Sequence, residues 1–376
     1  ADAYGHLYVT GQVNNNATFD PGAGTVTTSG ADVFLLKVDT AGNYLWVKTA
    51  SGAGADLAYK VALDPWNGVY LCGEFSSSGA GVVFGSTALV TGGGVDAFVA
   101  KADTAGNFIW AKKIGGTASV SDIAYSISVD KKGGVVAAGM FRSTSINFAP
   151  GISLANSGAS GSDEAWAARL DTAGNFKWAN SWGGTSNDIA WSVATDQDCN
   201  VYVSGTFIGN KIDFDPGTGA ADTFYMSSQV VNKRSAYWSK LDSNGKFIMA
   251  QGIMMGDGTG AGIAVDKNRN IYVTGGYVTS VVFGTATITS LGTFDGFLAK
   301  WNANGDFDWG IAQRGTGEDF MYNVTTDPDA NVYTTGYAKS SSLDVGGTAY
   351  SLKGQGDVII YKVEAPSVCA TTHTIW

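Results

Sequence analysis

The chain has 376 residues, of which 52 are glycine and only 15% are charged, against averages of about 7% glycine and about 25% charged residues. Its hydrophobic content of 44% excludes a disordered chain, and no stretch approaches the roughly 18 apolar residues of a membrane-spanning helix. A formal net charge of −10 without any basic stripe disfavours nucleic acid as a partner. High glycine, many aromatic residues and few charges favour an all-β protein with many tight turns.

A short strand-like motif that ends in glycine recurs along the chain. Its first copy reads Gly5-His-Leu-Tyr-Val-Thr-Gly11, and residues of this kind in alternation are typical of a β-strand. Copies follow about every 60 to 70 residues, and an aspartate leads each of them. Such steady self-similarity predicts a repeat architecture. The leading aspartates are Asp2, Asp64, Asp130, Asp196, Asp266 and Asp327.

Two further motifs follow within the repeats. The second reads Asp32-Val-Phe-Leu-Leu-Lys37 in its first copy and Asp357-Val-Ile-Ile-Tyr-Lys362 in its last. The third begins as Asp39-Thr-Ala-Gly-Asn-Tyr-Leu-Trp46, a turn sequence followed by an aromatic strand. The aspartate can accept backbone N–H bonds, and the glycine can take the positive φ that a tight turn needs. These motifs predict hairpins between antiparallel strands.

Each repeat is expected to contain four strands, because another strand precedes the leading aspartate, as in Tyr125-Ser-Ile-Ser-Val-Asp130. Four-stranded antiparallel units repeated in this way are typical of β-propeller blades, so the predicted fold class is an all-β propeller. Six repeats favour six blades over residues 1–364, and seven blades are the alternative. The predicted units are residues 2–63, 64–129, 130–195, 196–265, 266–326 and 327–364.

The two ends of the repeat region are irregular. The inner strand of the first repeat would precede Ala1, and the outer strand of the last repeat would follow Glu364. The tail, residues 365–376, has two interpretations. It is a closing strand, since Ile375-Trp376 is similar to Ile109-Trp110, or it is the start of a downstream domain.

With these motifs, and with Phe19-Asp-Pro-Gly22 and Phe214-Asp-Pro-Gly217, the chain resembles SBBP repeats, the β-propeller repeats of large bacterial proteins. The resemblance covers residues 2–364. It implies a propeller, for which the family name suggests seven blades, and it implies no assigned reaction. It also implies an extracellular or cell-surface location, because such repeats occur in secreted and surface proteins, commonly ahead of a type IX secretion sorting domain.

Few residues could carry catalysis. The two histidines are His6 and His373, and no Ser/His/Asp or Cys/His set can be assembled around them. The acids mostly recur at one position of every repeat, whereas a single active site needs asymmetry. We therefore expect no enzyme activity. Structural roles in turns are expected for Asp64, Asp130, Asp196, Asp266 and Asp327.

Two sets of aromatic residues also recur, and both are expected to fill contacts between blades, where rings bury large apolar areas. For the first set, stacking on sugars is the alternative. The first set occupies one position of the fourth strand, at Trp46, Trp110, Trp178 and Trp309. The second set lies five residues before the leading aspartate, at Tyr59, Tyr125, Trp191 and Tyr322.

No cofactor and no metal site is expected. The segment Asp327-Pro-Asp-Ala-Asn331 has the spacing of the first three ligands of a calcium loop. It lacks the glycine and the distal glutamate of an EF-hand. A turn is therefore the favoured interpretation, and bound calcium is the alternative.

The fourth repeat departs most from the pattern. It has Ser235 in place of aspartate and Met249 in place of tryptophan, and it contains extra loop residues. In a symmetric scaffold, loops that break the symmetry are the usual place for a specific contact. We hypothesise that a partner surface is marked by Lys233, Arg234, Met254 and Met255. Neutral divergence of one blade is the alternative.

The sequence thus predicts a secreted or cell-surface propeller that acts as a protein-interaction or structural scaffold, without catalysis. Its partner would be another protein or other domains of a larger surface protein. A rigid scaffold suits this role because little ordering is needed on binding. The alternative is a glycan-binding, lectin-like module or a polysaccharide-active enzyme, since one fold hosts many functions.

Overall fold

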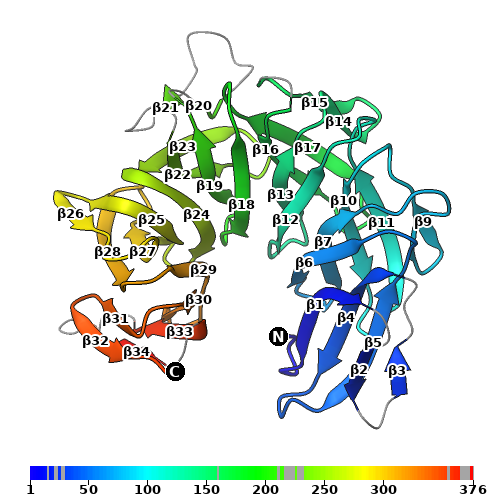
Figure 1. The fold of residues 1–376 in the computed structure, drawn as a ribbon. Coiled ribbons are helices and arrows are strands. Elements are labelled where there is room, and N and C mark those ends of the chain that lie inside the picture. The colour runs from blue at the N-terminus through cyan, green and yellow to red at the C-terminus, as the bar shows by residue number, and fades with distance from the viewer. Residues whose placement is uncertain are drawn as a thin grey trace. The chain divides into compact units, whose positions relative to one another are not determined.

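The computed structural model describes residues 1–14, 17–20, 24–26, 30–158, 161–209, 212–215, 225–226, 233–353, 356–364 and 373–375. These residues form antiparallel strands joined by turns (Figure 1), and no helix capable of crossing a membrane occurs among them. The chain divides into two compact units, Ala1–Ser181 and Trp182–Trp376.

The first unit contains three main sheets in chain order (Figure 1). In the second sheet, neighbouring strands follow the order β6-β7-β10-β11, and the third sheet has the same order in β12-β13-β16-β17. The first sheet has only β1-β4-β5. The bounds are β1 Leu7–Asn14, β4 Ala31–Val38, β5 Tyr44–Ala50, β6 Asp56–Leu63, β7 Val69–Phe75, β10 Asp96–Ala102, β11 Phe108–Ile114, β12 Asp122–Val129, β13 Val135–Phe141, β16 Glu164–Leu170 and β17 Phe176–Trp182.

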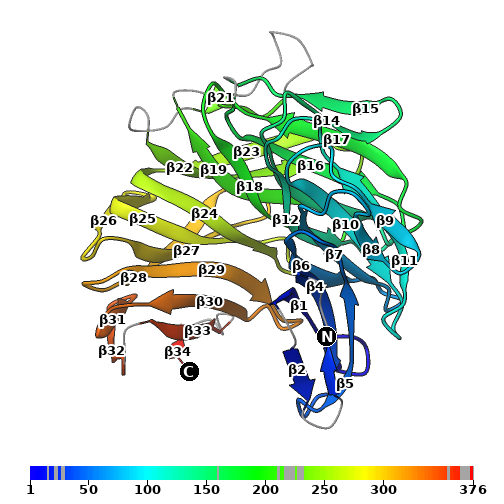
Figure 2. The same cartoon turned by 45° about the vertical axis from the view of Figure 1, so that its right-hand side comes forward.

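The second unit repeats this plan (Figure 2), with its sheets following one another from β18 to β34. The orders are β18-β19-β22-β23, β24-β25-β27-β28 and β29-β30-β33-β34. The bounds are β18 Asp188–Thr195, β19 Val201–Ile208, β22 Arg234–Leu241, β23 Phe247–Ile253, β24 Met255–Val265, β25 Ile271–Phe283, β27 Asp295–Trp301, β28 Phe307–Arg314, β29 Asp319–Thr326, β30 Val332–Ala338, β33 Asp357–Val363 and β34 His373–Ile375.

A short ribbon, which the sequence did not predict, lies between the second and third strands of each repeat. In β8-β9 it brings Phe84 within 4.8 Å of Phe98 and 5.1 Å of Phe108, measured between ring centroids. The ribbon therefore covers one end of the sheet with an aromatic ring. The ribbon strands are β2 Ala17–Asp20, β3 Gly24–Val26, β8 Val82–Phe84, β9 Thr87–Leu89, β14 Ser145–Ala149, β15 Ile152–Ala155, β20 Ile212–Asp213, β21 Tyr225–Met226, β26 Ala286–Thr289 (paired with the extended β25), β31 Ser342–Val345 and β32 Thr348–Ser351.

The core lies between successive sheets of each unit. Strand β7 shows why: Val69 and Leu71 pack toward the first sheet, and Tyr70 and Cys72 pack toward the third. All four are fully buried. A strand covered on both faces needs no alternation of polar and apolar residues, which explains the continuous apolar runs of the second and third strands. Face-to-face packing of successive four-stranded sheets is the organisation of β-propeller blades.

The blade count predicted from the sequence is wrong. Among the described residues, five sheets have the four blade strands, not six or seven, and the first repeat contributes three strands. In the first repeat, residues 1–6 form the turn that joins the first and second strands in the other repeats, closed by a bond from the Asp2 amide to the His6 carbonyl. Among the described residues, β1 pairs with β4 alone. In the last repeat, β34 pairs with β33 as the fourth strand.

The predicted hairpin turns are confirmed. In the turn before β5, the Asp39 carboxylate accepts bonds from the amides of Ala41 and Asn43, at 2.9 and 2.8 Å. Gly42 takes a φ of 84°. The Pro-Gly residues of the two Phe-Asp-Pro-Gly motifs, at 21–22 and 216–217, lie outside the described residues.

Candidate functional site

Each inner strand carries a β-bulge at the same point. In β6 the pairing with β7 shifts between Ala58 and Lys60, so Tyr59 is the extra residue. The equivalent shifts occur in β12, β18, β24 and β29. An extra residue in one strand bends it locally and re-aims the bulged side chain. The bulged aromatic residues are Tyr59, Tyr125, Trp191 and Tyr322.

In each repeat with a described first strand, a glycine of the second strand makes room for the bulge. A Cβ on Gly73 would lie 1.9 Å from the carbonyl oxygen of Leu57, and one on Gly336 would lie 2.0 Å from that of Phe320. Any side chain would overlap the bulged backbone at this distance. The Tyr-Val-Thr-Gly motif therefore accommodates the bulge as well as forming the strand.

The bulge brings these aromatic rings toward the surface, whereas the sequence predicts that they fill contacts between blades. That prediction holds for Tyr59 and Tyr125, whose ring centroids lie 5.3 Å apart on adjacent sheets, although neither ring is fully buried. Tyr59 is 41% exposed and Tyr322 is 57% exposed, while Tyr125 and Trp191 are half-buried. The exposure of the rings was missed because simple alternation along the strand ignores the extra residue. A recurring glycine on one strand together with a recurring aromatic residue on its partner was the available signal.

In the second unit, four rings form a continuous group that we call the aromatic row: Phe294, Phe320, Tyr322 and Tyr337. The ring centroids of Phe294 and Phe320 are 5.4 Å apart. Those of Phe320 and Tyr322 are 4.6 Å apart, and those of Tyr322 and Tyr337 are 5.6 Å apart. These separations are those of favourable aromatic pairs. The row crosses from the loop before β27 to β29 and β30.

Charged groups lie at both ends of the aromatic row. The Arg234 guanidinium is 5.7 Å from the centroid of Phe294, and its Nε lies 2.9 Å from Asp257 Oδ1. At the other end, Glu318 accepts hydrogen bonds from Tyr337 and Lys339. The bond from Lys339 holds the pKa of Glu318 below its usual range. Burial and the Glu318 carboxylate raise the pKa of the Tyr337 hydroxyl.

The structure separates the four residues of the predicted partner surface. Lys233 is exposed with its Nζ 3.8 Å from Asp257, and Arg234 lies at the aromatic row. Met254 is 49% exposed, but Met255 is 2% exposed and packs in the core. Met255 must therefore be removed from the surface: it begins β24 and packs in the core, whereas Met254 lies between β23 and β24. The residues that precede Lys233 in the chain, 230–232, lie outside the described residues.

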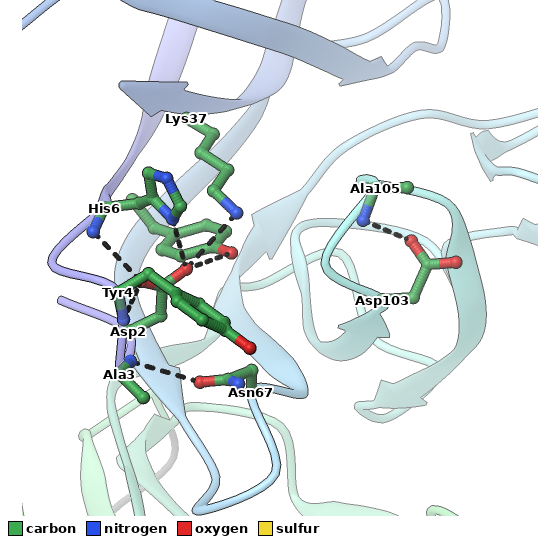
Figure 3. A network of polar contacts seen from close by, with 9 residues as sticks. Asp2, Ala3, Tyr4, His6, Lys37, Asn67, Asp103 and Ala105 are labelled. Atoms are coloured by element: carbon green, nitrogen blue, oxygen red, sulfur yellow. Dashed lines mark hydrogen bonds and ion pairs between the residues drawn. The ribbon is translucent and has the colours of Figure 1, made fainter. Parts of the chain in front are cut away.

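The leading aspartates hold the turns that precede the second strands, as Figure 3 shows for Asp2. All of them are buried except Asp327, which is half-buried. Asp2 accepts bonds from the amides of Tyr4 and His6, and its other oxygen lies 2.9 Å from His6 Nδ1. Burial alone would raise the pKa of Asp2, but the hydrogen bonds from His6 and Lys37 hold it well below its usual range. The His6 side chain is thus engaged by Asp2 within this turn. The side chain of His373 is not among those that the structure describes.

A tyrosine and a lysine complete most of these turns. The Tyr70 hydroxyl donates to Asp64 at 2.9 Å, and Lys101 Nζ lies 4.9 Å from the Tyr70 ring centroid. In the third repeat, which has no tyrosine here, Arg169 bonds to Asp130 directly. The remaining Tyr–Lys pairs are Tyr8–Lys37, Tyr202–Lys240, Tyr272–Lys300 and Tyr333–Lys362.

The fourth-strand tryptophans are half-buried, and where their contacts are described they bridge sheets or brace a sheet from within. Trp110 donates from Nε1 to the Thr172 carbonyl at 3.2 Å, in a turn of the next repeat. Trp46 packs on the core shared by the first two sheets and lies 6.0 Å from Tyr8. Trp309 lies 6.2 Å from Tyr272, and Trp178 is likewise half-buried.

The suspected calcium loop folds as a turn. Asp327 accepts bonds from the amides of Asp329 and Asn331, both at 2.9 Å, and from the Asn331 side chain at 2.7 Å. Its oxygens are thus engaged by the turn itself. No cluster of three metal-ligating side chains occurs among the described residues.

Comparison with known proteins gives a distant match. No family model matches the chain. Over 91% of its length the chain is 20% identical to an uncharacterized WD repeat-containing protein of Acanthamoeba polyphaga mimivirus. It spans 29% of the length of that relative. The match agrees with the β-propeller organisation seen in both units.

Proposed function

We propose that the protein is a non-catalytic β-propeller scaffold that binds protein partners through the aromatic row. One observation carries this proposal: Tyr322 is 57% exposed although it belongs to a contiguous group of four rings. Aromatic residues and arginine are enriched in protein interfaces and dominate their binding energy. The row combines both, because Arg234 lies against Phe294.

Further support for a binding role comes from the rigidity of the strands that carry the aromatic row. Strands β29 and β30 hold Phe320, Tyr322 and Tyr337 in a hydrogen-bonded sheet, so little conformational freedom is lost on binding. The distant relative is named as a WD repeat protein. For this chain, that name supports the proposal of a scaffold role. We further propose a secreted or cell-surface location, for which the support is the resemblance to SBBP repeats.

A peptide library displayed on phage, panned against the purified protein, tests the proposal. We expect enriched peptides whose affinity falls at least about tenfold in Tyr322→Ser, the size of one interface contact of about 1.4 kcal/mol. The matched control is Trp66→Ser, because Trp66 is 64% exposed in the first unit. Peptide affinities that are equal in wild type and Tyr322→Ser would contradict the proposal, and so would selective hits on a glycan array alone.

A further inference from the structure

A cavity lies in the first unit, where the turns at the leading aspartates of the first three repeats come together. Its volume is about 340 Å³. Sites for small molecules have volumes of roughly 300–1,000 Å³ and are lined mainly by apolar side chains. This cavity has the size of a small site, but its lining combines small residues with polar ones. The lining includes Ala3, Asp64, Asn67, Asp130 and Lys131.

Two exposed aromatic side chains border this cavity. Trp66 precedes Asn67 in the chain and is 64% exposed. Tyr4 follows Ala3 and is 76% exposed. The Ala3 amide donates to Asn67 Oδ1 at 3.4 Å, so the two turns lie side by side (Figure 3). The Trp66 ring reaches the turn of the third repeat, because a Cβ on Gly133 would lie 2.8 Å from it.

The backbone that carries both rings is fixed by hydrogen bonds. The Trp66 amide donates to Asp64 Oδ1 at 2.9 Å, and the Tyr4 amide donates to Asp2 Oδ1 at 3.0 Å. Both aspartates are buried. A ligand that binds between these turns therefore orders little of the chain, which reduces the entropic cost of binding.

The fold does not require an aromatic residue at either position. Trp66 and Tyr4 each stand two residues after a leading aspartate. The other four repeats form the same turn with an exposed polar residue there. Aromatic rings thus occur only in two of the three turns that line the cavity, and a local departure from the symmetry of a scaffold is typical of a binding site. The four polar residues are Lys132, Asp198, Asn268 and Asp329.

The cavity also offers hydrogen-bond donors. The carboxylates of Asp64 and Asp130 are engaged by their own turns and by a neighbouring tyrosine or arginine. Among the described residues, no partner occurs for Asn67 Nδ2 or for the ammonium group of Lys131, which is exposed. Both groups can donate to an oxygen of a ligand.

We propose that this cavity binds a pyranose ring of a glycan. One face of a pyranose presents C–H groups that can cover an aromatic ring, and the hydroxyls around its rim can accept bonds from Asn67 and Lys131. A polar lining with aromatic rings only at its border suits this ligand better than an apolar molecule. The site is separate from the aromatic row and goes beyond the scaffold function proposed above.

An array of bacterial, plant and animal glycans, probed with the labelled protein, tests this site. We expect selective binding to glycans that share one terminal sugar. Isothermal titration should then show that the methyl glycoside of that sugar binds and that sorbitol, which has hydroxyls but no ring face, does not. A blank array, or sorbitol that binds as tightly as the glycoside, would overturn the proposal.

Variants locate the binding. We expect Trp66→Leu to weaken glycan binding at least about tenfold, the size of one aromatic contact, and Trp66→Tyr, which keeps a ring, to weaken it clearly less. Lys131→Ala should weaken it about threefold or more, because one hydrogen bond is lost. The matched control is Asn268→Ala, at the equivalent turn position in the second unit, which should leave binding unchanged.

The same variants separate this proposal from the proposed function. Thermal unfolding verifies that each variant is folded, and capture of peptides by the aromatic row should be unchanged in Trp66→Leu. Loss of glycan binding with intact peptide capture supports a separate site. Undiminished glycan binding in folded Trp66→Leu would place the sugar elsewhere and overturn the proposal.

Discussion

At the scale of single residues, identical hydrogen bonds differ in importance because of burial. Asp64 and Asp103 each accept two amide bonds and one side-chain bond in a tight turn. Asp64 is 6% exposed and its third donor is the fully buried Tyr70 hydroxyl, whereas the bonds of Asp103 are exposed. The sequence predicts both turns from the same residue types. Only the structure shows that the hydrogen bonds of Asp64 are buried and those of Asp103 are exposed.

We expect Asp64→Ala to lower the free energy of unfolding by about 3 kcal/mol, because it leaves a buried hydroxyl and two amides without their acceptor. Asp103→Ala loses the same number of hydrogen bonds, but these are exposed to water, so the free energy of unfolding should fall clearly less. The double variant Asp64→Ala/Tyr70→Phe should recover about 1 kcal/mol, since the orphaned hydroxyl is gone. Urea unfolding measures all three. Equal losses for Asp64→Ala and Asp103→Ala would contradict the burial argument.

Replacing Glu74 and replacing Glu318 should change the free energy of unfolding at pH 7 in opposite directions, because their pKa values are shifted in opposite directions. Burial raises the pKa of Glu74 above its ordinary value of 4.5, so the folded state favours the protonated form and loses stability as pH rises through that range. Glu74→Gln should therefore stabilise the protein at pH 7, and the gain should disappear below about pH 4. The bond from Lys339 lowers the pKa of Glu318, so Glu318→Gln should destabilise at pH 7, and that loss should fade as pH falls. Denaturant unfolding at both pH values checks the two signs. Two variants that shift stability in the same direction at pH 7 would refute this reading.

At the scale of secondary-structure elements, the sequence predicts the strands and turns well and misses two features. The four strands of each complete blade, the turns at the aspartates and the propeller class all follow from the repeat. The ribbons were missed because β8 and β9 are three residues each, too short for periodicity to show. The bulges were missed because they shift the side-chain alternation on which the prediction of buried faces rests. Tyr322 of the aromatic row is such a bulge residue, which is why sequence reasoning did not expect it at the surface.

A pair of equivalent turn glycines separates backbone strain from packing between sheets. Gly42 and Gly106 have φ values of 84° and 83° in corresponding turns. A Cβ on Gly42 would meet no atom within 4 Å, whereas one on Gly106 would lie 2.8 Å from the Trp46 ring. Gly42→Ala should cost about 1 kcal/mol, the strain of a left-handed alanine. Gly106→Ala should cost about 1–3 kcal/mol more, because Trp46 must also move. Thermal unfolding compares the two, and equal destabilisation would show that Trp46 does not pack tightly on this turn.

At the scale of the whole molecule, the local stability of each sheet should increase with the fraction of its apolar side chains that neighbouring sheets bury. Ala97 and Val99 of β10 are fully buried between two sheets. The residues at the same motif positions of β33, Val358 and Ile360, are 75% and 41% exposed. In β1, Leu7 and Val9 are 46% and 43% exposed. The sheets that begin and end the repeat region therefore gain less free energy from apolar burial than the sheets inside each unit.

Amide hydrogen exchange should reveal this gradient. Burial of one large aliphatic side chain contributes about 1.5–3 kcal/mol, so each uncovered side chain should speed local opening at least about tenfold. We expect the amides of β1 and β33 to exchange about 10- to 100-fold faster than those of β10 and β27. Exchange followed by mass spectrometry of peptides from each strand measures the ratio. If the amides of β1 and β33 were protected as well as those of β10, the exposed faces of β1 and β33 would have to be covered by another molecule in solution. The Val358→Asp variant, which places a charge on the face of β33, should then release that molecule and speed the exchange of β33.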